Sequence, residues 1–406
     1  MPQALPHALP LALFVLTYAG LAVGRIPGLA LDRTGFALLG AVAFLATGEV
    51  PLEDAKQAVD AGTLAVLFGM MILSAQYQQS GLYAAIGQRL ARTEKPRRLL
   101  LGALLVAAAL SAVLTNDVIC FALTPLLAAA LLRGGMNPLP FLLALACGAN
   151  LGSALTPIGN PQNILIAQRL HLAFLPFVGA CAAPVAIGLA FAYWWIRRDV
   201  PATCPSRDGD GAPPAIPLDR REAAKAVALT AAAIVLFLSP IPNGVTALAV
   251  AGVVLTSRKM HTRDTLSLVD WHTLALFVGL FVVHRGLENS GWTELAHRAL
   301  TSSGADVTRP AVLVPTVAVL GNLVGNVPAV MMLLPFVPAA PKIGWAMALI
   351  STFAGNALLI GSIANIIVAE QAALLGLPFG FRDHLRVGLP VTLVSLLAAV
   401  VAMAFW

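Results

Sequence analysis

The stretch Cys147–Asn163, C-G-A-N-L-G-S-A-L-T-P-I-G-N-P-Q-N, decides how this chain can fold. It lies within a long apolar run, between residues 141–146 and 164–167, where a membrane helix would be expected. Pro157 and Pro161 remove two backbone donors and interrupt a regular helix. Lipid offers no partner to the carbonyl groups freed in this way. We therefore predict a broken helix around a binding site; the alternative is a proline kink satisfied by neighbouring helices.

The composition is that of an integral membrane protein. Of the 406 residues, 59% are apolar and only 11% are charged, and the mean hydropathy is +0.85. Soluble domains are about a quarter charged. Apolar runs of about 20 residues, the length that crosses a bilayer, recur along the chain. We expect an all-α, multi-pass protein of the cell inner (plasma) membrane, in which the first run, Ala8–Val23, is a retained helix and not a signal peptide.

A polar joint, Thr115-Asn116-Asp117, separates two apolar stretches, Leu99–Leu114 and Val118–Leu132. Each stretch has about 15 to 16 residues, roughly 23 Å as a helix, which is short for a full crossing. The pattern therefore predicts a re-entrant helical hairpin at residues 99–132, with its tip inside the membrane. The broken helix follows at residues 139–168.

The second half of the sequence repeats the polar features of the first, for the most part at a constant offset of 210 residues. With small gaps near the end, the matching pairs are Asn116 and Asn326, Pro125 and Pro335, Asn150 and Asn356, and Asn163 and Asn365. We predict a first repeat at residues 1–196, a linker at 197–221 and a second repeat at 222–406. The second repeat would contain a hairpin at 311–340 and a broken helix at 343–371. Each repeat would hold about five spans, in opposite orientations, which is typical of secondary transporters.

The basic residues set the expected orientation. With the termini outside and the linker in the cytoplasm, the cytoplasmic segments hold 19 of the 25 Lys and Arg residues, including Arg33. The opposite orientation would invert that ratio. We therefore predict outside termini and a cytoplasmic linker.

Four motifs give the chain a likeness to a known family: L-T-N-D-V at Leu114–Val118, N-L-G-S-A-L-T-P-I-G-N-P-Q-N at Asn150–Asn163, G-N-V-P-A-V-M-M-L-L-P at Gly325–Pro335 and G-N-A-L-L-I-G-S-I-A-N at Gly355–Asn365. With these motifs the chain resembles the ion transporter superfamily, which includes divalent anion/sodium symporters (SLC13-like), arsenite permeases and related sodium/proton antiporters. It is most similar to the arsenite-permease-like anion permeases. The resemblance implies two re-entrant hairpins, one from each side, whose tips face two unwound helices at the membrane centre.

The resemblance also implies where substrate and ions bind, namely at the hairpin tips and the unwound segments. The candidate residues are Thr115, Asn116, Asp117, Asn150, Thr156, Gly159, Asn160, Asn163, Gly325, Asn326, Asn356, Gly361, Ser362 and Asn365. Among them, Asn116, Asp117 and Asn326 are candidates for a Na⁺ site. The tips read T-N-D and G-N-V where the dicarboxylate branch has S-N-T, and G-N-P-Q-N stands where antiporter-like relatives tend towards G-D-P-P-N. This more neutral segment disfavours a pure cation exchanger.

Two transport functions follow from these residues. The first is secondary active transport of a small anion or oxyacid, such as arsenite or another inorganic or organic anion, coupled to Na⁺ or H⁺ by alternating access. The second is a Na⁺/H⁺ antiporter-like exchanger with Asp117 as its carrier carboxylate. A carboxylate at membrane depth needs a partner, a cation or a proton, although Asp117 could instead cap the second hairpin helix.

An enzyme is not expected, because the sequence has no His-Glu-x-x-His motif, no G-x-S-x-G elbow and no nucleotide-binding G-x-x-x-x-G-K loop. No cofactor is expected beyond a bound Na⁺. The expected partners are the transported anion, Na⁺ or H⁺, the lipid bilayer and, as one option, a second copy of the chain. No nucleic acid is expected.

Overall fold

The computed structural model describes the chain except for residues 1–6, 25–27, 29, 94, 202–216, 258 and 303–305, and the side chains of residues 91 and 301. Most of the predicted linker, 197–221, lies outside the described residues. The regular elements in the described part are helices, without strands. In the first half they are α1 (Ala8–Val23), α2 (Arg33–Ala46), α3 (Leu52–Ala58), α4 (Ala61–Gln79), α5 (Leu82–Ala91), α6 (Pro96–Val113), α7 (Asn116–Arg133), α8 (Leu139–Ser153), α9 (Pro161–Arg169) and α10 (Phe174–Ile196). The all-α prediction is confirmed.

The second half has its helices in the same order. They are α11 (Arg220–Phe237), α12 (Asn243–Leu255), α13 (Thr262–Ser267), α14 (Trp271–Asn289), α15 (Trp292–Ser302), α16 (Pro310–Val324), α17 (Asn326–Leu333), α18 (Pro341–Ala354), α19 (Ile363–Leu374) and α20 (Phe381–Met403). Short 3₁₀ turns follow α10 at Arg197–Asp199, follow α17 at Leu334–Phe336 and precede α19 at Leu359–Gly361.

The repeated sequence produces repeated local structure. The Asp60 carboxylate accepts a hydrogen bond from the backbone N–H of Thr63 (2.9 Å) at the start of α4. At the start of α14, the Asp270 carboxylate accepts from the N–H of Thr273 (3.0 Å). An aspartate N-cap satisfies one of the free N–H groups of the first helical turn. The two helices therefore begin by the same capping contact at matching positions.

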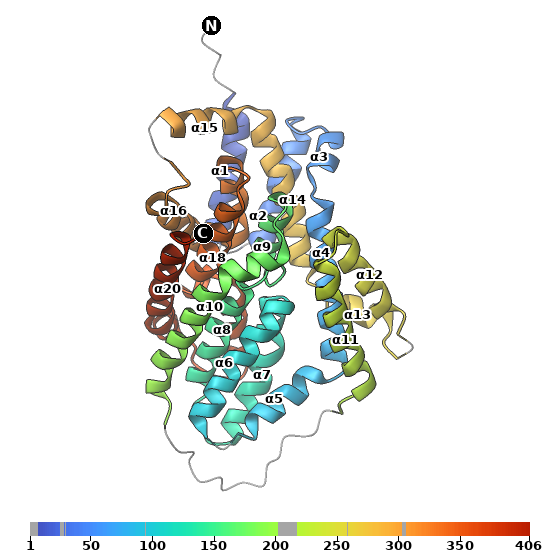
Figure 1. The fold of residues 1–406 in the computed structure, drawn as a ribbon. Helices are drawn as coiled ribbons and strands as arrows, with labels where there is room; N and C mark the ends of the chain where they lie inside the picture. The colour runs from blue at the N-terminus through green and yellow to red at the C-terminus, as the bar shows by residue number, and fades with distance from the viewer. Residues whose placement is uncertain are drawn as a thin grey trace.

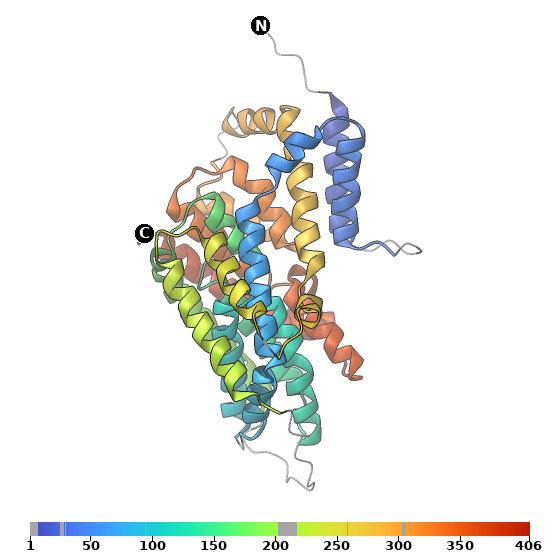
Figure 2. The ribbon, with the colours of Figure 1, turned by 90° about the vertical axis from the view of Figure 1, so that its right-hand side faces the viewer.

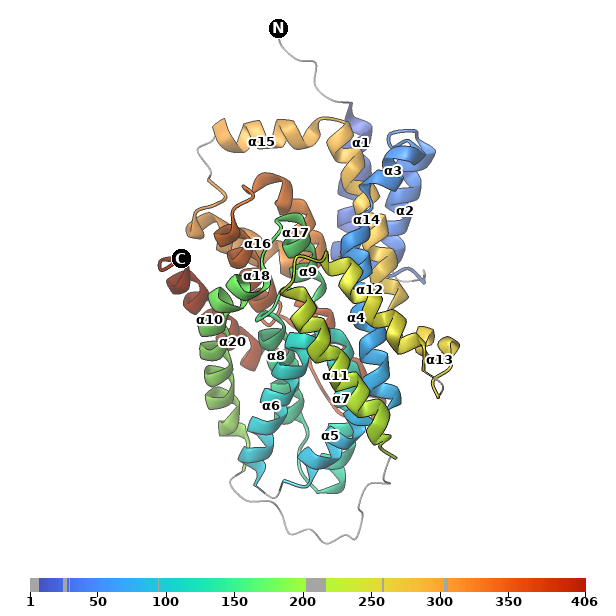
Figure 3. The ribbon, with the colours of Figure 1, turned by 45° about the vertical axis from the view of Figure 1, so that its right-hand side comes forward.

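Corresponding helices lie at opposite ends of the molecule. The short helix α5 lies at the lower end and α15 at the upper end in Figures 1 and 3. The α6–α7 pair occupies the lower half, whereas α16 and α17 lie in the upper half (Figure 3). Figure 2 shows the same separation of α5 and α15 from the side. This placement is what two repeats of opposite orientation would give; the repeat boundaries and the membrane sides stay predictions.

The lengths of the hairpin arms differ from the prediction. Helices α6 and α7 have 18 residues each, about 27 Å at 1.5 Å per residue, so they are not too short to cross a bilayer. Pro96 stands at the first helical position of α6, where its missing N–H costs nothing, and the charged residues after it join the helix. The length argument for a re-entrant hairpin at 99–132 is therefore wrong for these arms.

Few helices are both long and apolar enough to make a full membrane span on their own. In the described part, α6, α7, Phe174–Asp199 and α20 are long and apolar enough, and the pair α3 and α4, bent by 55°, would make a fifth. The other apolar helices have 10–17 residues. The predicted spans of each half are thus mostly short or interrupted helices.

The broken helices form the centre of the fold. Every residue of α8 from Pro140 to Ser153 is buried, as is every residue of α18 from Ala346 to Ala354. Close packing of α8 against α6 depends on small residues: a Cβ atom at Gly148 would lie 2.8 Å from the Leu104 carbonyl oxygen. Small residues allow helix backbones to approach closely in a membrane protein. The polar side chains at the ends of α8 and α18, such as Asn150, Asn160 and Asn356, are consequently buried in the protein interior.

Candidate functional site

Two helical segments in the described part of the chain are interrupted by a short unwound stretch, which we call a break. The first break separates α8, which ends at Ser153, from α9, which begins at Pro161. The second separates α18, which ends at Ala354, from α19, which begins at Ile363. These breaks fall within the predicted stretches 139–168 and 343–371. Each break frees backbone carbonyl groups that need buried partners.

Asn163 supplies those partners in the first break. Its side-chain Nδ2 donates to the carbonyl oxygens of Ser153 (3.2 Å) and Thr156 (3.0 Å). Asn160 Oδ1 accepts a hydrogen bond from the backbone N–H of Asn163 (2.9 Å), and Asn160 thereby caps α9. Asn163 and Asn160 are both fully buried. Asn163 therefore holds the unwound segment closed on itself.

Asn365 makes the same contacts in the second break. Its Nδ2 donates to the carbonyl oxygens of Gly355 (2.8 Å) and Leu358 (3.3 Å), at the same spacings of ten and seven residues. His384, on α20, adds a contact that the sequence did not predict: its Nε2 lies 2.9 Å from the Asn356 carbonyl oxygen. The same Nε2 lies 3.3 Å from Asn365 Nδ2, so its role as donor to the carbonyl or acceptor from the amide depends on the tautomer of the ring. No sequence signal separates this histidine from one in an ordinary helix.

A chain of carboxamides joins the two halves. Asn116 Nδ2, at the first hairpin tip, donates to Asn150 Oδ1 (2.9 Å), and Asn150 Nδ2 donates to Asn356 Oδ1 (2.8 Å) and Asn365 Oδ1 (3.0 Å). Ser362 Oγ also donates to Asn150 Oδ1 (3.1 Å). Asn150 is 1% exposed. One predicted residue therefore connects the first tip to both parts of the second break.

The first break is tied to its surroundings in a similar way. The Gly159 carbonyl accepts the backbone N–H of Asn116 (3.2 Å), and Thr156 Oγ1 donates to a carbonyl of α6. Asn160 Nδ2 donates to Thr352 Oγ1 on α18 (3.1 Å). Thr352 was not among the predicted residues, because nothing local distinguishes it from a threonine that packs between apolar helices.

Both hairpin tips line one small central cavity of about 40 Å³. The predicted residues in its wall are Asn116, Asp117, Gly325, Asn326, Gly361 and Ser362. The remaining predicted residues do not line the cavity; Asn150, Thr156, Gly159, Asn160, Asn163, Asn356 and Asn365 belong to the hydrogen-bond network around it, and Thr115 is buried at the first tip. The structure thus brings together the tips, which are far apart in the sequence.

Four helices begin at this cavity. The first residues of α7, α9, α17 and α19 all line it, namely Asn116, Pro161, Asn326 and Ile363. The N-terminus of a helix carries free N–H groups and a partial positive charge. Four such ends around one cavity favour an anion or a polarised oxygen atom.

Buried oxygen atoms at the tips lack a protein partner. In the described part of the chain, Thr115 Oγ1, Asn116 Oδ1 and Asn326 Oδ1 are buried without a hydrogen bond. Buried polar atoms are rarely left unpaired. Oxygen ligands of this kind suit a hard cation such as Na⁺, so these groups fit the predicted ion site.

Asp117 does not act as the helix cap that was one of its two interpretations. The N-cap of α7 is Thr115, no side chain accepts a capping hydrogen bond there, and Asp117 lies in the first turn. Within the described residues, the Asp117 carboxylate has no ion pair, although it lines the cavity. Its carboxylate therefore remains available to a cation or a proton.

Arg33 is a charged residue of the cavity wall that the sequence did not predict as part of the site. It begins α2 and lines the cavity. A Cβ atom at Gly325 would lie 3.5 Å from Arg33 Nη1, so the guanidinium lies against the second hairpin tip. The sequence reading counted Arg33 among the cytoplasmic loop charges, since only the tertiary structure brings α2 to this tip.

Broken helices whose ends meet hairpin tips around a small cavity with polar groups in its wall define the class of this protein: it is a membrane transporter. Residues 12–351 match the family described as citrate transporter (CitMHS), and the chain belongs to that family. The resemblance to the ion transporter superfamily is thereby confirmed.

Relatives match the chain along almost its whole length. It is 29% identical to the silicon efflux transporter LSI3 of Oryza sativa subsp. japonica, with 91% of this chain and 92% of that protein covered. It is 30% identical to the uncharacterized transporter Rv2685 of Mycobacterium tuberculosis (strain ATCC 25618 / H37Rv), with 96% of each covered. The crystal structure of the Alcanivorax borkumensis YdaH transporter has a similar fold, with a TM-score of 0.59, 16% identity, and 98% of this chain and 97% of that chain covered. These relatives are transporters, in keeping with the expectation of a non-enzymatic protein.

Proposed function

We propose that this protein is a secondary active transporter that moves a small anion or oxyacid across the membrane by alternating access, coupled to Na⁺ or H⁺. The observation that carries the proposal is the convergence of four helix N-termini on the central cavity. Those ends, with the Arg33 guanidinium, supply positive potential and N–H donors for an oxyanion or the oxygen atoms of a neutral oxyacid.

The size of the cavity supports a small substrate. The family is described as a citrate transporter family, and one relative is named a silicon efflux transporter. A cavity of about 40 Å³ has room for roughly one to three water-sized groups. In this conformation it suits a small inorganic oxyanion or oxyacid better than a tricarboxylate.

Coupling would use the oxygen atoms at the tips. Asn116 Oδ1, Asn326 Oδ1 and the Asp117 carboxylate are the groups that would hold Na⁺. A cation bound there would bring the two hairpins together and complete the anion site, because both tips line the same cavity. A proton on Asp117 would serve the same purpose without a metal ion.

A Na⁺/H⁺ antiporter-like exchanger is the second candidate function. The observation in its favour is the Asp117 carboxylate, which lines the cavity without an ion pair in the described part of the chain. The presence of Arg33 in the same wall counts against it, since a cation bound there without an anion would meet uncompensated like charge.

The test is uptake by the purified protein in liposomes. Silicic acid, arsenite, phosphate and citrate would be offered under an imposed Na⁺ or pH gradient. We expect gradient-driven accumulation of at least one small oxyanion or oxyacid, and its loss in Arg33→Gln. The matched control is Arg309→Gln, since Arg309 is 72% exposed and pairs with Asp306. Exchange of Na⁺ for H⁺ with no uptake of any of the four compounds would favour the exchanger.

A further inference from the structure

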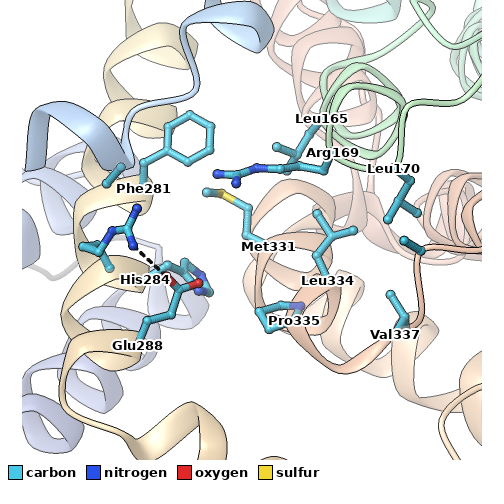
Figure 4. Close-up of a pocket in the computed structure, with 13 residues that line it drawn as sticks. Leu165, Arg169, Leu170, Phe281, His284, Glu288, Met331, Leu334, Pro335 and Val337 are labelled. Atoms are coloured by element: carbon cyan, nitrogen blue, oxygen red, sulfur yellow. Dashed lines mark ion pairs between the residues drawn. The ribbon is translucent and has the colours of Figure 1, made fainter. Parts of the chain in front are cut away.

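A second and larger cavity lies between α14 and the helices α9 and α17. Its volume is about 310 Å³, at the lower end of the range for small-molecule sites. Figure 4 shows Arg169 reaching from α9 towards Phe281 on α14, with Met331 and Leu334 of the α17 segment below. We call this the outer cavity. Its walls therefore come from separate helices.

The same helices line the central cavity one or two turns away. Helix α9 contributes Pro161 and Gln162 to the central cavity, and Leu165 and Arg169 to the outer one. Helix α17 contributes Asn326 to Pro328 to the central cavity and Met331 to the outer one. The two cavities are thus successive parts of one groove between α14 and the α9–α17 wall.

Tyr18 separates the two cavities. Its hydroxyl lies 2.6 Å from His284 Nε2, in the wall of the outer cavity, and donates to the Pro328 carbonyl oxygen (3.0 Å), in the wall of the central one. Tyr18 is 5% exposed. The outer cavity is therefore a site of its own while this contact persists.

Two arginines in the outer cavity have hydrogen-bond donors that the protein leaves unused. Arg169 Nε lies 3.3 Å from Asp60 Oδ2, and among the described residues its two terminal nitrogens have no ion-pair partner. Arg285 Nη1 lies 3.5 Å from Glu288 Oε2, while Arg285 Nε is buried with no hydrogen bond. A guanidinium presents its donors in a planar fork that matches a carboxylate.

Apart from His284 and Glu288, the rest of the cavity lining is apolar. The Arg169 guanidinium carbon lies 5.6 Å from the centroid of the Phe281 ring, which forms one wall, and Met331 and Leu334 form another. An inorganic oxyanion would leave these surfaces exposed to water. A ligand with an anionic head and a small apolar body would cover them.

We propose that the outer cavity binds a small organic carboxylate, with its carboxylate group between Arg169 and Arg285 and its apolar body against Phe281, Met331 and Leu334. The bound ligand contacts both sides of the groove, so it holds α14 against α9 and α17 and stabilises this conformation. This inference is independent of what the central cavity transports, because it concerns binding to the resting protein.

Benzoate is a suitable probe, and its binding to the purified full chain in detergent is measured by calorimetry and by the thermal unfolding midpoint. We expect benzoate to bind and to raise the midpoint, and benzyl alcohol, which lacks the charge, to do neither. Arg169→Gln and Arg285→Gln should each weaken benzoate binding about tenfold or more, since each removes a charge-assisted hydrogen bond. Arg309→Gln should leave it unchanged.

A labelling experiment keeps the arginines intact and guards against variants that do not fold. In Cys204→Ser, Leu334→Cys adds a thiol to the cavity wall, while the native Cys120, Cys147 and Cys181 are buried. We expect benzoate to slow modification of the new thiol by a small methanethiosulfonate reagent. Unprotected labelling, or equal benzoate binding by both Gln variants, would overturn the proposal. If phosphate bound in an arginine-dependent way and benzoate did not bind, the proposed contact of an apolar body with Phe281, Met331 and Leu334 would be overturned. Loss of transport in a variant that still binds benzoate would concern the central cavity alone.

Discussion

Asn163 and Asn365 hold the two breaks by the same pair of contacts, to carbonyl groups ten and seven residues earlier. These contacts give both side chains a structural role, because they satisfy backbone carbonyl groups whether or not a ligand is bound. Neither lines the central cavity. Their influence on that cavity passes through the shape of the break and, for Asn365, through the contact with Asn150.

The first prediction concerns these two asparagines. Asn163→Ala and Asn365→Ala should each abolish transport and also lower the stability of the protein. Each leaves buried carbonyl oxygens without a side-chain donor, at a cost of about 1–3 kcal/mol. Uptake into liposomes and thermal unfolding in detergent measure the two effects.

The matched control is Asn289→Ala, because Asn289 is exposed and its side-chain nitrogen donates to Asp54 Oδ2 (3.0 Å) outside the breaks. We expect it to change neither quantity. If Asn163→Ala and Asn365→Ala lost transport at wild-type stability, these side chains would be ligands of the substrate and not clamps of the break.

The second prediction concerns Asp117. Asp117→Asn keeps the shape of the side chain but removes the charge, so it should abolish gradient-driven accumulation and retain slow exchange of substrate. Since Asp117 makes no capping hydrogen bond, loss of a cap would not explain such a result. Counterflow and gradient-driven uptake in liposomes separate the two activities. Asp264→Asn, at an exposed position, is the control. An Asp117→Asn variant that still concentrated substrate would refute the coupling role.

At the scale of elements, the second hairpin tip depends on its glycine. Gly325 has φ +97° and ψ 156°, a conformation that other residues rarely adopt. The second break illustrates a different route, because no proline lies between Ala354 and Ile363. Unlike the first break, it was predicted only from its match to the first half.

The third prediction uses that tip. Gly325→Ala should destabilise the protein by about 1–3 kcal/mol, since the backbone conformation is essentially restricted to glycine. Gly252→Ala is a control of opposite sign. Gly252 lies within α12 with no atom within 4 Å of an added Cβ, so alanine should stabilise by about 0.5–1 kcal/mol. Thermal unfolding of both variants measures the difference, and equal effects would contradict this account of the tip.

Features that depend on residues close together in the sequence could be predicted, whereas contacts between distant segments could not. Local chemistry, such as Pro157, Pro161 and the polar joint at Asn116, identified the first break and the first tip, and the repeat in the sequence then predicted their counterparts in the second half. The contact of Arg33 with the second tip could not be predicted, because α2 and that tip are distant in sequence and meet only in the folded protein. The arms of the first hairpin were drawn too short because charged residues were taken as helix ends. The outer cavity was missed for the same reason as Arg33.

At the scale of the whole molecule, two observations bear on the orientation of the two halves. The opposite positions of α5 and α15 in Figure 1 and the excess of basic residues in one set of loops both favour inverted repeats. The two observations are independent, since one comes from the packing of helices and the other from charge alone. Parallel repeats would be at odds with both observations.

The fourth prediction tests the orientation directly. Single cysteines at Gln88, in α5, and at Arg207, in the linker, should react with a membrane-impermeant maleimide only from the cytoplasmic side of the membrane. A cysteine at Glu53, an exposed position of α3, should react only from the outside.

Each variant is made in Cys204→Ser, because the other native cysteines are buried. Labelling of intact and of inverted vesicles distinguishes the two sides, and a permeant maleimide confirms that each thiol is reactive. Labelling of Glu53→Cys from the same side as the other two would show that the first half does not cross the membrane between α3 and α5, and with it the inverted arrangement would fall.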